Sequence, residues 1–193
     1  MMIAIIKYNA GNVRSVENAI RRIGFDCVVT DDKEKINAAD KVIFPGVGEA
    51  SSAMSYLKKY QLDDLIRSLK QPMLGICLGQ QLMCNHSEEG NTDCLRVFNA
   101  NVKLFPPKEL VPHMGWNNLL DLKGDLFKGI TNLDNVYFVH SYYAEICEST
   151  KAVCDYILPF SAAMQKNNFY ATQFHPEKSA SVGEKILKNF LEL

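Results

Sequence analysis

The chain has 193 residues, 47% of them apolar, and a formal net charge of −1 at pH 7. This size and apolar content fit one globular domain spanning residues 1–193 and disfavour a disordered chain. A balanced charge without a Lys/Arg cluster argues against nucleic acid or an anionic membrane as a partner. No stretch approaches the roughly 20 apolar residues of a membrane-spanning helix, and the first apolar run is too short for a signal, so we expect a cytoplasmic protein.

The first half of the chain alternates short apolar segments with amphipathic ones. Apolar runs predict four buried strands, at Ile3–Ile6, Cys27–Thr30, Lys41–Phe44 and Met73–Ile76. The spacing of apolar residues predicts a helix after the first, third and fourth strands, with Asn12 as the N-cap of the first helix. This alternation predicts an α/β fold, with a mostly parallel central sheet and helices on both faces. In such folds functional groups collect where the strands end.

The second half is less regular and richer in β-like segments. Strands are expected at Val102–Phe105, Val136–Val139, Ala152–Ile157 and Tyr170–Phe174. The proline-containing stretch 104–110 and the segment PHMGWNN around Trp116 are interpreted as loops. The chain closes with a helix, and Ser181 and Glu184 have the spacing of a capping box at its start.

Cysteine usage indicates reduced thiols rather than disulfides or a metal site. The six cysteines are scattered through a chain large enough to fold without cross-links, and no C-x-x-C pair occurs. The pair Cys84 and His86 lacks companions at the spacing of zinc ligands. We therefore expect neither a metal nor a cofactor.

The segment LGICLGQQL at 74–82 places a cysteine where a strand turns into a helix. Cys77 stands on that hinge between Gly75 and Gly79, which let the backbone pack closely, as in a nucleophile elbow. An ordinary thiol is only a few per cent thiolate at pH 7, and the N-terminus of a helix favours the anion. Cys77 is therefore the candidate nucleophile.

The segment QFHPEKS supplies a candidate base and its partner. His175 follows a predicted strand, and Pro176 favours an extended conformation for it. Because residues i and i+2 of an extended chain project to the same side, Glu177 can lie beside the imidazole of His175. A carboxylate there would accept the imidazole N–H and stabilise the imidazolium, which is the role of the third member of a catalytic triad.

Backbone N–H groups for a developing oxyanion are expected from two turns. The first is the N–H of Leu78, directly after the candidate nucleophile. The turn PGVG at 45–48 offers a second N–H, from either Val47 or Gly48, at the end of another strand. Taken singly, each feature is more often structural: an inert buried cysteine, a hydrogen-bonded histidine or an ordinary turn. Together, at strand ends of one sheet, they favour acyl-transfer chemistry.

These motifs resemble those of the class I, or triad-type, glutamine amidotransferases over nearly the whole chain. The pattern G-x-C-x-G-x-Q matches Gly75, Cys77, Gly79 and Gln81, and the pattern His-x-Glu matches His175 and Glu177. Within that family, the segments PGVGEA, VPHMGWN and YFVHSYY are similar to those of the glutaminase subunits of imidazole glycerol-phosphate synthase. The resemblance implies a flavodoxin-like three-layer fold.

The resemblance also implies an activity and a partner. Glutamine would be hydrolysed to glutamate and ammonia through a thioester on Cys77, with His175 moving protons and Glu177 orienting His175. Ammonia would pass to a (β/α)8-barrel cyclase subunit, bound as a heterodimer, in histidine biosynthesis. The resemblance places contacts to L-glutamine at Gly46, Val47, Gly48, Gln81, His140, Ser141 and Tyr142. It places the cyclase interface at Asn12, Trp116, Tyr137 and Lys178, while a core anchor is an equally good interpretation of Trp116.

The chain departs from the family pattern at two places, and other functions compete with the main hypothesis. The family commonly has methionine at the position of Gln80, and CLRVF at 94–98 replaces a more glycine-rich loop. One competitor is a glutaminase of a related sugar-amidination pathway. Another is a cysteine hydrolase or peptidase on a similar sheet. A third is a non-catalytic flavodoxin-like interaction module in which Cys77 is merely buried.

Overall fold

The computed structural model describes residues 1–193 and is built around a seven-stranded sheet with the order β11-β12-β13-β4-β3-β1-β2. Neighbours from β13 to β2 are parallel, whereas β12 runs antiparallel to both β13 and β11. The mostly parallel sheet predicted from the sequence is therefore confirmed. The strands are β1 (Ile3–Ile6), β2 (Cys27–Thr30), β3 (Lys41–Phe44), β4 (Met73–Ile76), β11 (Thr150–Tyr156), β12 (Leu158–Lys166) and β13 (Phe169–Thr172).

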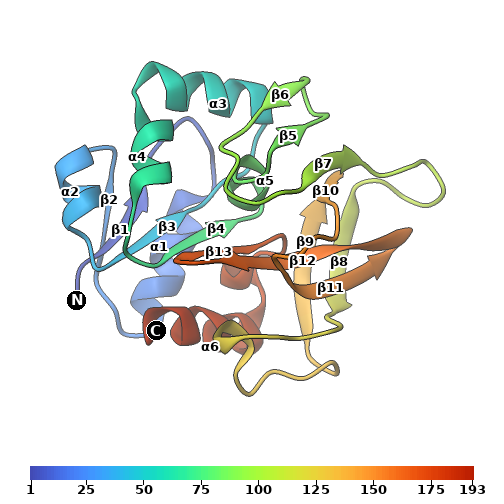
Figure 1. Cartoon of the computed structure of the whole chain (residues 1–193). Coiled ribbons are helices and arrows are strands. Elements are labelled where there is room, and N and C mark those ends of the chain that lie inside the picture. Colours follow the sequence, from blue (N-terminus) through green and yellow to red (C-terminus); the bar gives the residue numbers. More distant parts are fainter.

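Helices cover both faces of this sheet, as predicted (Figure 1). One face packs against α1 and α6 and the other against α2 to α5, each with its own apolar core. Strand β1 shows why its run is continuously apolar: Ile3 and Ile5 enter one core, and Ala4 and Ile6 the other. No helix combines the length and the apolar character that crossing a membrane requires. The helices are α1 (Val13–Arg22), α2 (Lys33–Ala38), α3 (Ala50–Lys59), α4 (Leu62–Ser68), α5 (Leu78–Leu82) and α6 (Ala180–Leu191).

Two smaller sheets extend one end of the molecule. A four-stranded sheet has the order β10-β7-β5-β6, and β8 pairs antiparallel with β9. Their strands are β5 (His86–Ser87), β6 (Thr92–Asp93), β7 (Asn101–Leu104), β8 (His113–Asn118), β9 (Asn135–His140) and β10 (Tyr142–Ala144). Short 3-10 helices occur at η1 (Asp125–Phe127) and η2 (Pro176–Lys178).

The structure differs from the sequence predictions in several segments, and it adds α2, α4, β5, β6 and β10 to the predicted elements. All of the segment PHMGWNN except Pro112 forms β8 rather than a loop, because its backbone pairs along β9. The long strand β12 was not predicted. The capping box is wrong: α6 begins at Ala180, no side chain caps it, and the carboxylate of Glu184 instead pairs with Arg22 at 2.5 Å.

The order of the central strands brings three functional segments together. β13, β4 and β3 are direct neighbours and run parallel, with Thr172 opposite Ile76 and Phe44 opposite Gly75. Their carboxyl ends therefore meet at one edge of the sheet. The PGVG and QFHPEKS segments directly follow the ends of β3 and β13, and LGICLGQQL spans the end of β4, although the three lie far apart in the sequence.

Candidate active site

Cys77 occupies a sharp turn between β4 and α5. Its φ is +53° and its ψ is −105°, a conformation that costs a residue with a side chain about 1–3 kcal/mol. Neighbouring backbone holds it there: the N–H of Cys77 donates to the carbonyl of Thr172 at 2.7 Å. A Cβ at Gly79 would lie 2.1 Å from the carbonyl oxygen of Phe44, so only glycine allows this close approach. The turn therefore has the geometry of a nucleophile elbow.

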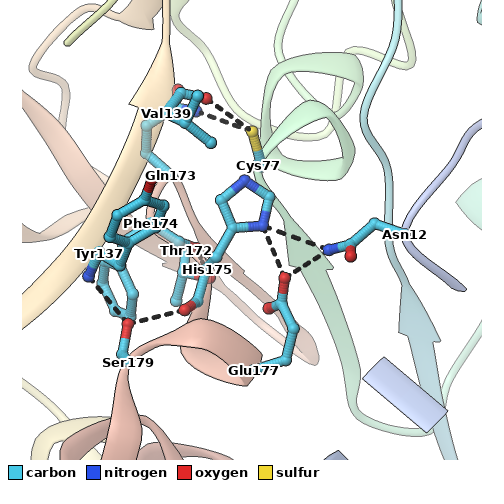
Figure 2. Close-up of polar contacts among 10 residues, drawn as sticks. All are labelled: Asn12, Cys77, Tyr137, Val139, Thr172, Gln173, Phe174, His175, Glu177 and Ser179. Atoms are coloured by element: carbon cyan, nitrogen blue, oxygen red, sulfur yellow. Dashed lines mark hydrogen bonds and ion pairs between the residues drawn. The ribbon is translucent and has the colours of Figure 1, made fainter. Parts of the chain in front are cut away.

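The imidazole of His175 lies between the sulfur of Cys77 and the carboxylate of Glu177 (Figure 2). Its Nδ1 atom is 2.7 Å from Oε1 of Glu177. Because an ionised carboxylate only accepts hydrogen bonds, Nδ1 carries the proton. The other nitrogen, Nε2, is buried without a hydrogen-bond partner and points toward Cys77. The three side chains are thus arranged as a thiol, a base and an orienting carboxylate.

Opposing effects set the pKa of His175. Burial disfavours the charged ring and lowers the pKa, whereas the sulfur of Cys77 and the carboxylate of Glu177 stabilise the imidazolium. The net effect raises the pKa of His175 from 6.5 to about 10. Beside a thiolate, the ring is therefore protonated at neutral pH and can donate from Nε2.

Asn12 contacts the same carboxylate from the other side. Its side-chain amide donates to Oε1 of Glu177 (Figure 2). Asn12 does precede α1, but it has a φ of +71° and makes no capping hydrogen bond. Asn12 is therefore the N-cap residue of α1 by position, as predicted, but its side chain binds Glu177 and does not cap the helix. The second oxygen of Glu177, Oε2, is buried without a partner, so Asn12 and His175 together hold this carboxylate through Oε1 alone.

A cavity of about 260 Å³ opens beside the sulfur. Most residues predicted to contact the substrate or the oxyanion line it: Val47, Gly48, Cys77, Leu78, Gln81, His140, Ser141 and Tyr142. Gly46 does not line the cavity. No group of three or more His, Cys, Asp or Glu side chains is arranged to hold a metal ion. Sequence motifs thus identified most of one continuous pocket from segments that are distant in the chain.

One of the expected oxyanion donors is hydrogen-bonded to another group in this structure. The N–H of Leu78 donates to the carbonyl of Gly46 at 3.3 Å, and the carbonyl of Val47 accepts from the N–H of Gly11 at 3.0 Å. The PGVG turn therefore presents an oxygen to the N–H of Leu78. Gly48 has a φ of +140°, which glycine adopts readily and other residues rarely do. Rotation of peptides in this turn would release the N–H of Leu78.

Three of the residues predicted at an interface lie around the triad and outside the cavity. Trp116 is 55% exposed, and its ring packs edge-on against Tyr137 with centroids 5.9 Å apart. This exposure excludes the core-anchor interpretation of Trp116. The carbonyl of Tyr137 accepts the N–H of His175 at 2.9 Å, so β9 is tied to the triad segment. Lys178 follows Glu177 and is exposed.

Sequence reasoning missed two polar residues at this site. Glu89 supplies the carboxylate among the cavity-lining side chains; it accepts the N–H of Ala50 at 2.8 Å, and burial raises its pKa. Gln173 is fully buried, with Nε2 3.6 Å from the sulfur of Cys77. Glu89 sits in the acidic segment SEEG, which is typical of a solvated loop, so no local pattern pointed to it. Gln173 stands two residues before His175, and strand alternation could have identified it.

The chain is similar in sequence and in fold to known glutamine amidotransferases. The chain matches the family model described as glutamine amidotransferase class-I over residues 4–193. A relative from Bacteroides fragilis, named imidazole glycerol phosphate synthase subunit HisH, is 62% identical over 100% of both chains. A protein of the same name from Bacteroides thetaiotaomicron is 57% identical, again over 100% of both. A solved crystal structure of a glutamine amidotransferase is similar in fold, with a TM-score of 0.75 at 18% identity, covering 98% of this chain and 97% of that one.

Proposed function

Since this chain belongs to the class-I glutamine amidotransferase family, we propose that it is the glutaminase subunit of an imidazole glycerol phosphate synthase, the name its Bacteroides relatives carry. The family and the fold predicted from the sequence are both confirmed. One observation supports the assignment of residues most directly. A buried imidazole lies between the sulfur of Cys77 and the carboxylate of Glu177, to which it is hydrogen-bonded, beside a cavity.

We assign the cavity to L-glutamine. Glu89 is placed to pair with the α-ammonium group of the substrate, which needs a negative partner away from water. Gln81 and the segment 140–142 would contact the rest of the amino acid, the segment chiefly through its backbone. This pose directs the side-chain amide of glutamine toward the sulfur of Cys77.

In the first half of the reaction, the thiolate of Cys77 attacks the amide carbon of glutamine. The N–H of Leu78 and one from the PGVG turn, at Val47 or Gly48, would stabilise the oxyanion; losing one such donor typically raises the barrier by about 3 kcal/mol. His175 then gives its Nε2 proton to the amide nitrogen. The C–N bond breaks, ammonia leaves and a thioester remains on Cys77.

In the second half, the now neutral His175 takes a proton from water through Nε2. The water oxygen attacks the thioester carbon, the C–S bond breaks, and the carboxylic acid formed loses its proton to solvent as glutamate is released. The thiolate and the imidazolium are restored. Glu177 retains its hydrogen bond to Nδ1 throughout, which keeps Nε2 directed at the reacting atoms.

We propose that the ammonia passes to a (β/α)8-barrel cyclase subunit in the cytoplasm. The exposed ring of Trp116, together with Tyr137, Lys178 and Asn12, would form the docking surface. The bond between the N–H of Leu78 and the carbonyl of Gly46 supports partner-dependent activity, because an occupied donor cannot stabilise an oxyanion. The isolated chain is expected to hydrolyse glutamine slowly, and rapid hydrolysis without the cyclase would contradict this gating.

The decisive experiment separates glutamine-dependent from ammonia-dependent synthesis by the reconstituted complex. Cys77→Ala and Cys77→Ser are expected to abolish synthesis with glutamine and to leave synthesis with added ammonium salt near the parent rate. A glutamine analogue carrying an electrophile should label Cys77 in the parent complex. Loss of both activities, or full glutamine-dependent activity in either variant, would overturn the assignment.

A further inference from the structure

We propose that Gln173 is a further catalytic residue of this site, whose side-chain N–H donates a hydrogen bond to the reacting sulfur of Cys77 and supports the thiolate. This inference rests on the proposed glutaminase function. Gln173 directly follows β13, is fully buried and has its Nε2 atom 3.6 Å from Sγ of Cys77. That separation suits a hydrogen bond to sulfur, whose lone pairs lie farther out than those of oxygen.

The position of Gln173 follows from the extended chain that also delivers the base. Residues 173 and 175 are two apart, so their side chains project to the same side of the segment. Figure 2 shows the sulfur with the imidazole of His175 on one side and the side chain of Gln173 on the other. The N–H of Gln173 donates to the carbonyl of Ala162 at 2.8 Å, which fixes its backbone to β12.

The neighbouring hydrogen bonds determine which end of the Gln173 amide faces the sulfur. Nε2 of Gln81 donates to the backbone carbonyl of Tyr142 at 2.9 Å and to Oε1 of Gln173 at 3.0 Å. A backbone carbonyl only accepts, so the amino group of Gln81 must face it. The same amino group then requires an acceptor from Gln173. The oxygen of Gln173 therefore faces Gln81, and its NH2 group faces Cys77.

The two protonation states of Cys77 have different partners in this arrangement. The thiol can donate to the carbonyl of Val139, 3.9 Å from Sγ. The thiolate instead accepts from Gln173 and pairs with the imidazolium of His175. Because the sulfur is largely shielded from water, a donor from the protein replaces hydration that the buried anion would otherwise lack. Gln173 is thus matched to the charged form of the nucleophile.

Two substitutions separate this role from a merely structural one. Gln173→Glu keeps the oxygen that accepts from Gln81 and replaces the NH2 group that faces the sulfur. Gln173→Met keeps much of the side-chain length without placing a charge beside Cys77. The other ionisable groups coupled to this sulfur are His175 and Tyr8, and both variants retain them. Gln80→Met is the matched control, because Gln80 is a buried amide that donates to the carbonyl of Ser161 instead.

The experiment measures how the rate of Cys77 alkylation by iodoacetamide depends on pH in the full chain, with adducts located by peptide mass spectrometry. Both Gln173 variants are expected to raise the midpoint by about 1 pH unit or more, which makes alkylation roughly tenfold slower at pH values below the parent midpoint. Gln80→Met should keep the midpoint of the parent. In the reconstituted complex, both Gln173 variants should lower kcat for glutamine about tenfold while KM changes little.

An unchanged alkylation midpoint in Gln173→Met, with native thermal unfolding, would overturn the proposal. A change in KM alone would also overturn it, because that result indicates a role in substrate contact through Gln81. Alkylation needs no glutamine turnover, so a parent complex that fails to hydrolyse glutamine refutes the proposed function and leaves the test of Gln173 intact.

Discussion

The buried imidazole pair formed by His113 and His140 predicts that acidification sharply lowers the free energy of unfolding. Nδ1 of His140 is 2.7 Å from the carbonyl of Tyr142 and must therefore carry a proton. Nε2 of His140 is then the acceptor for Nδ1 of His113, 3.1 Å away. The ring of His113 is stacked between Phe138 and Tyr156, with centroids 4.7 and 4.0 Å away. A second proton on His140 would lie on Nε2 and would point at the N–H of His113, so that two donors would face each other.

Burial lowers the pKa of His113 from 6.5 to about 4, and burial together with neighbouring histidines lowers that of His140 to about 3. Both folded-state pKa values lie below the value of 6.5 in the unfolded chain. The contribution of the pair to stability is therefore full above pH 6.5 and is lost as pH falls. The linkage relation gives a loss of about 1.5 kcal/mol for each histidine between pH 6.5 and 5.0, or about 3 kcal/mol for the pair. This loss depends little on the folded-state pKa values, because both lie below this pH range.

The assay is urea unfolding, followed by circular dichroism, at pH 6.5 and 5.0 for the parent and for His113→Gln. The variant should lose about 1.5 kcal/mol less on acidification, whatever its stability at pH 6.5. His86→Gln controls for loss of an exposed imidazole. The pKa of His175 is raised, so its contribution to stability is full below pH 6.5 and is lost as pH rises through 10. Because His175 is present in all three proteins, its contribution does not affect the comparison.

Equal losses in the parent and in His113→Gln would refute the reasoning. That result would mean that His113 is already protonated at pH 5.0 in the folded protein, despite its burial between the rings of Phe138 and Tyr156.

Three further predictions concern single side chains. Gly79→Ala should lower stability to urea by at least about 2 kcal/mol, because its Cβ would overlap the backbone oxygen of Phe44; parent-like stability would show that the turn can widen. Asn12→Ala should reduce kcat for glutamine about tenfold when the cyclase is present at saturating concentration, since Glu177 loses a charge-assisted hydrogen bond; an unchanged kcat would contradict this. Gln80→Met should match or exceed the parent in stability by up to about 1 kcal/mol, because Oε1 of Gln80 is buried without a partner; a clear loss in urea unfolding would indicate that the bond to Ser161 outweighs that cost.

Local patterns predicted the elements that lie in the buried sheet. β1 to β4 occur with the predicted bounds because each is a mainly apolar run, and β1, β3 and β4 are buried along their whole length. The residues of β8 suit turns and therefore predict a loop, yet pairing with β9 stabilises the segment as a strand. Tertiary pairing outweighed local propensity there.

Neighbours within a few residues define the candidate nucleophile and base, so the amino-acid order was enough to identify both. Glycines around Cys77 and the proline between His175 and Glu177 restrict the backbone locally, and those restrictions hold in the structure. The hydrogen-bonding role of Asn12 and the direction of the Gln173 amide could be established only from the folded chain. Their partners lie from 92 to 165 residues away along the chain, and a hydrogen bond depends on atoms meeting in space.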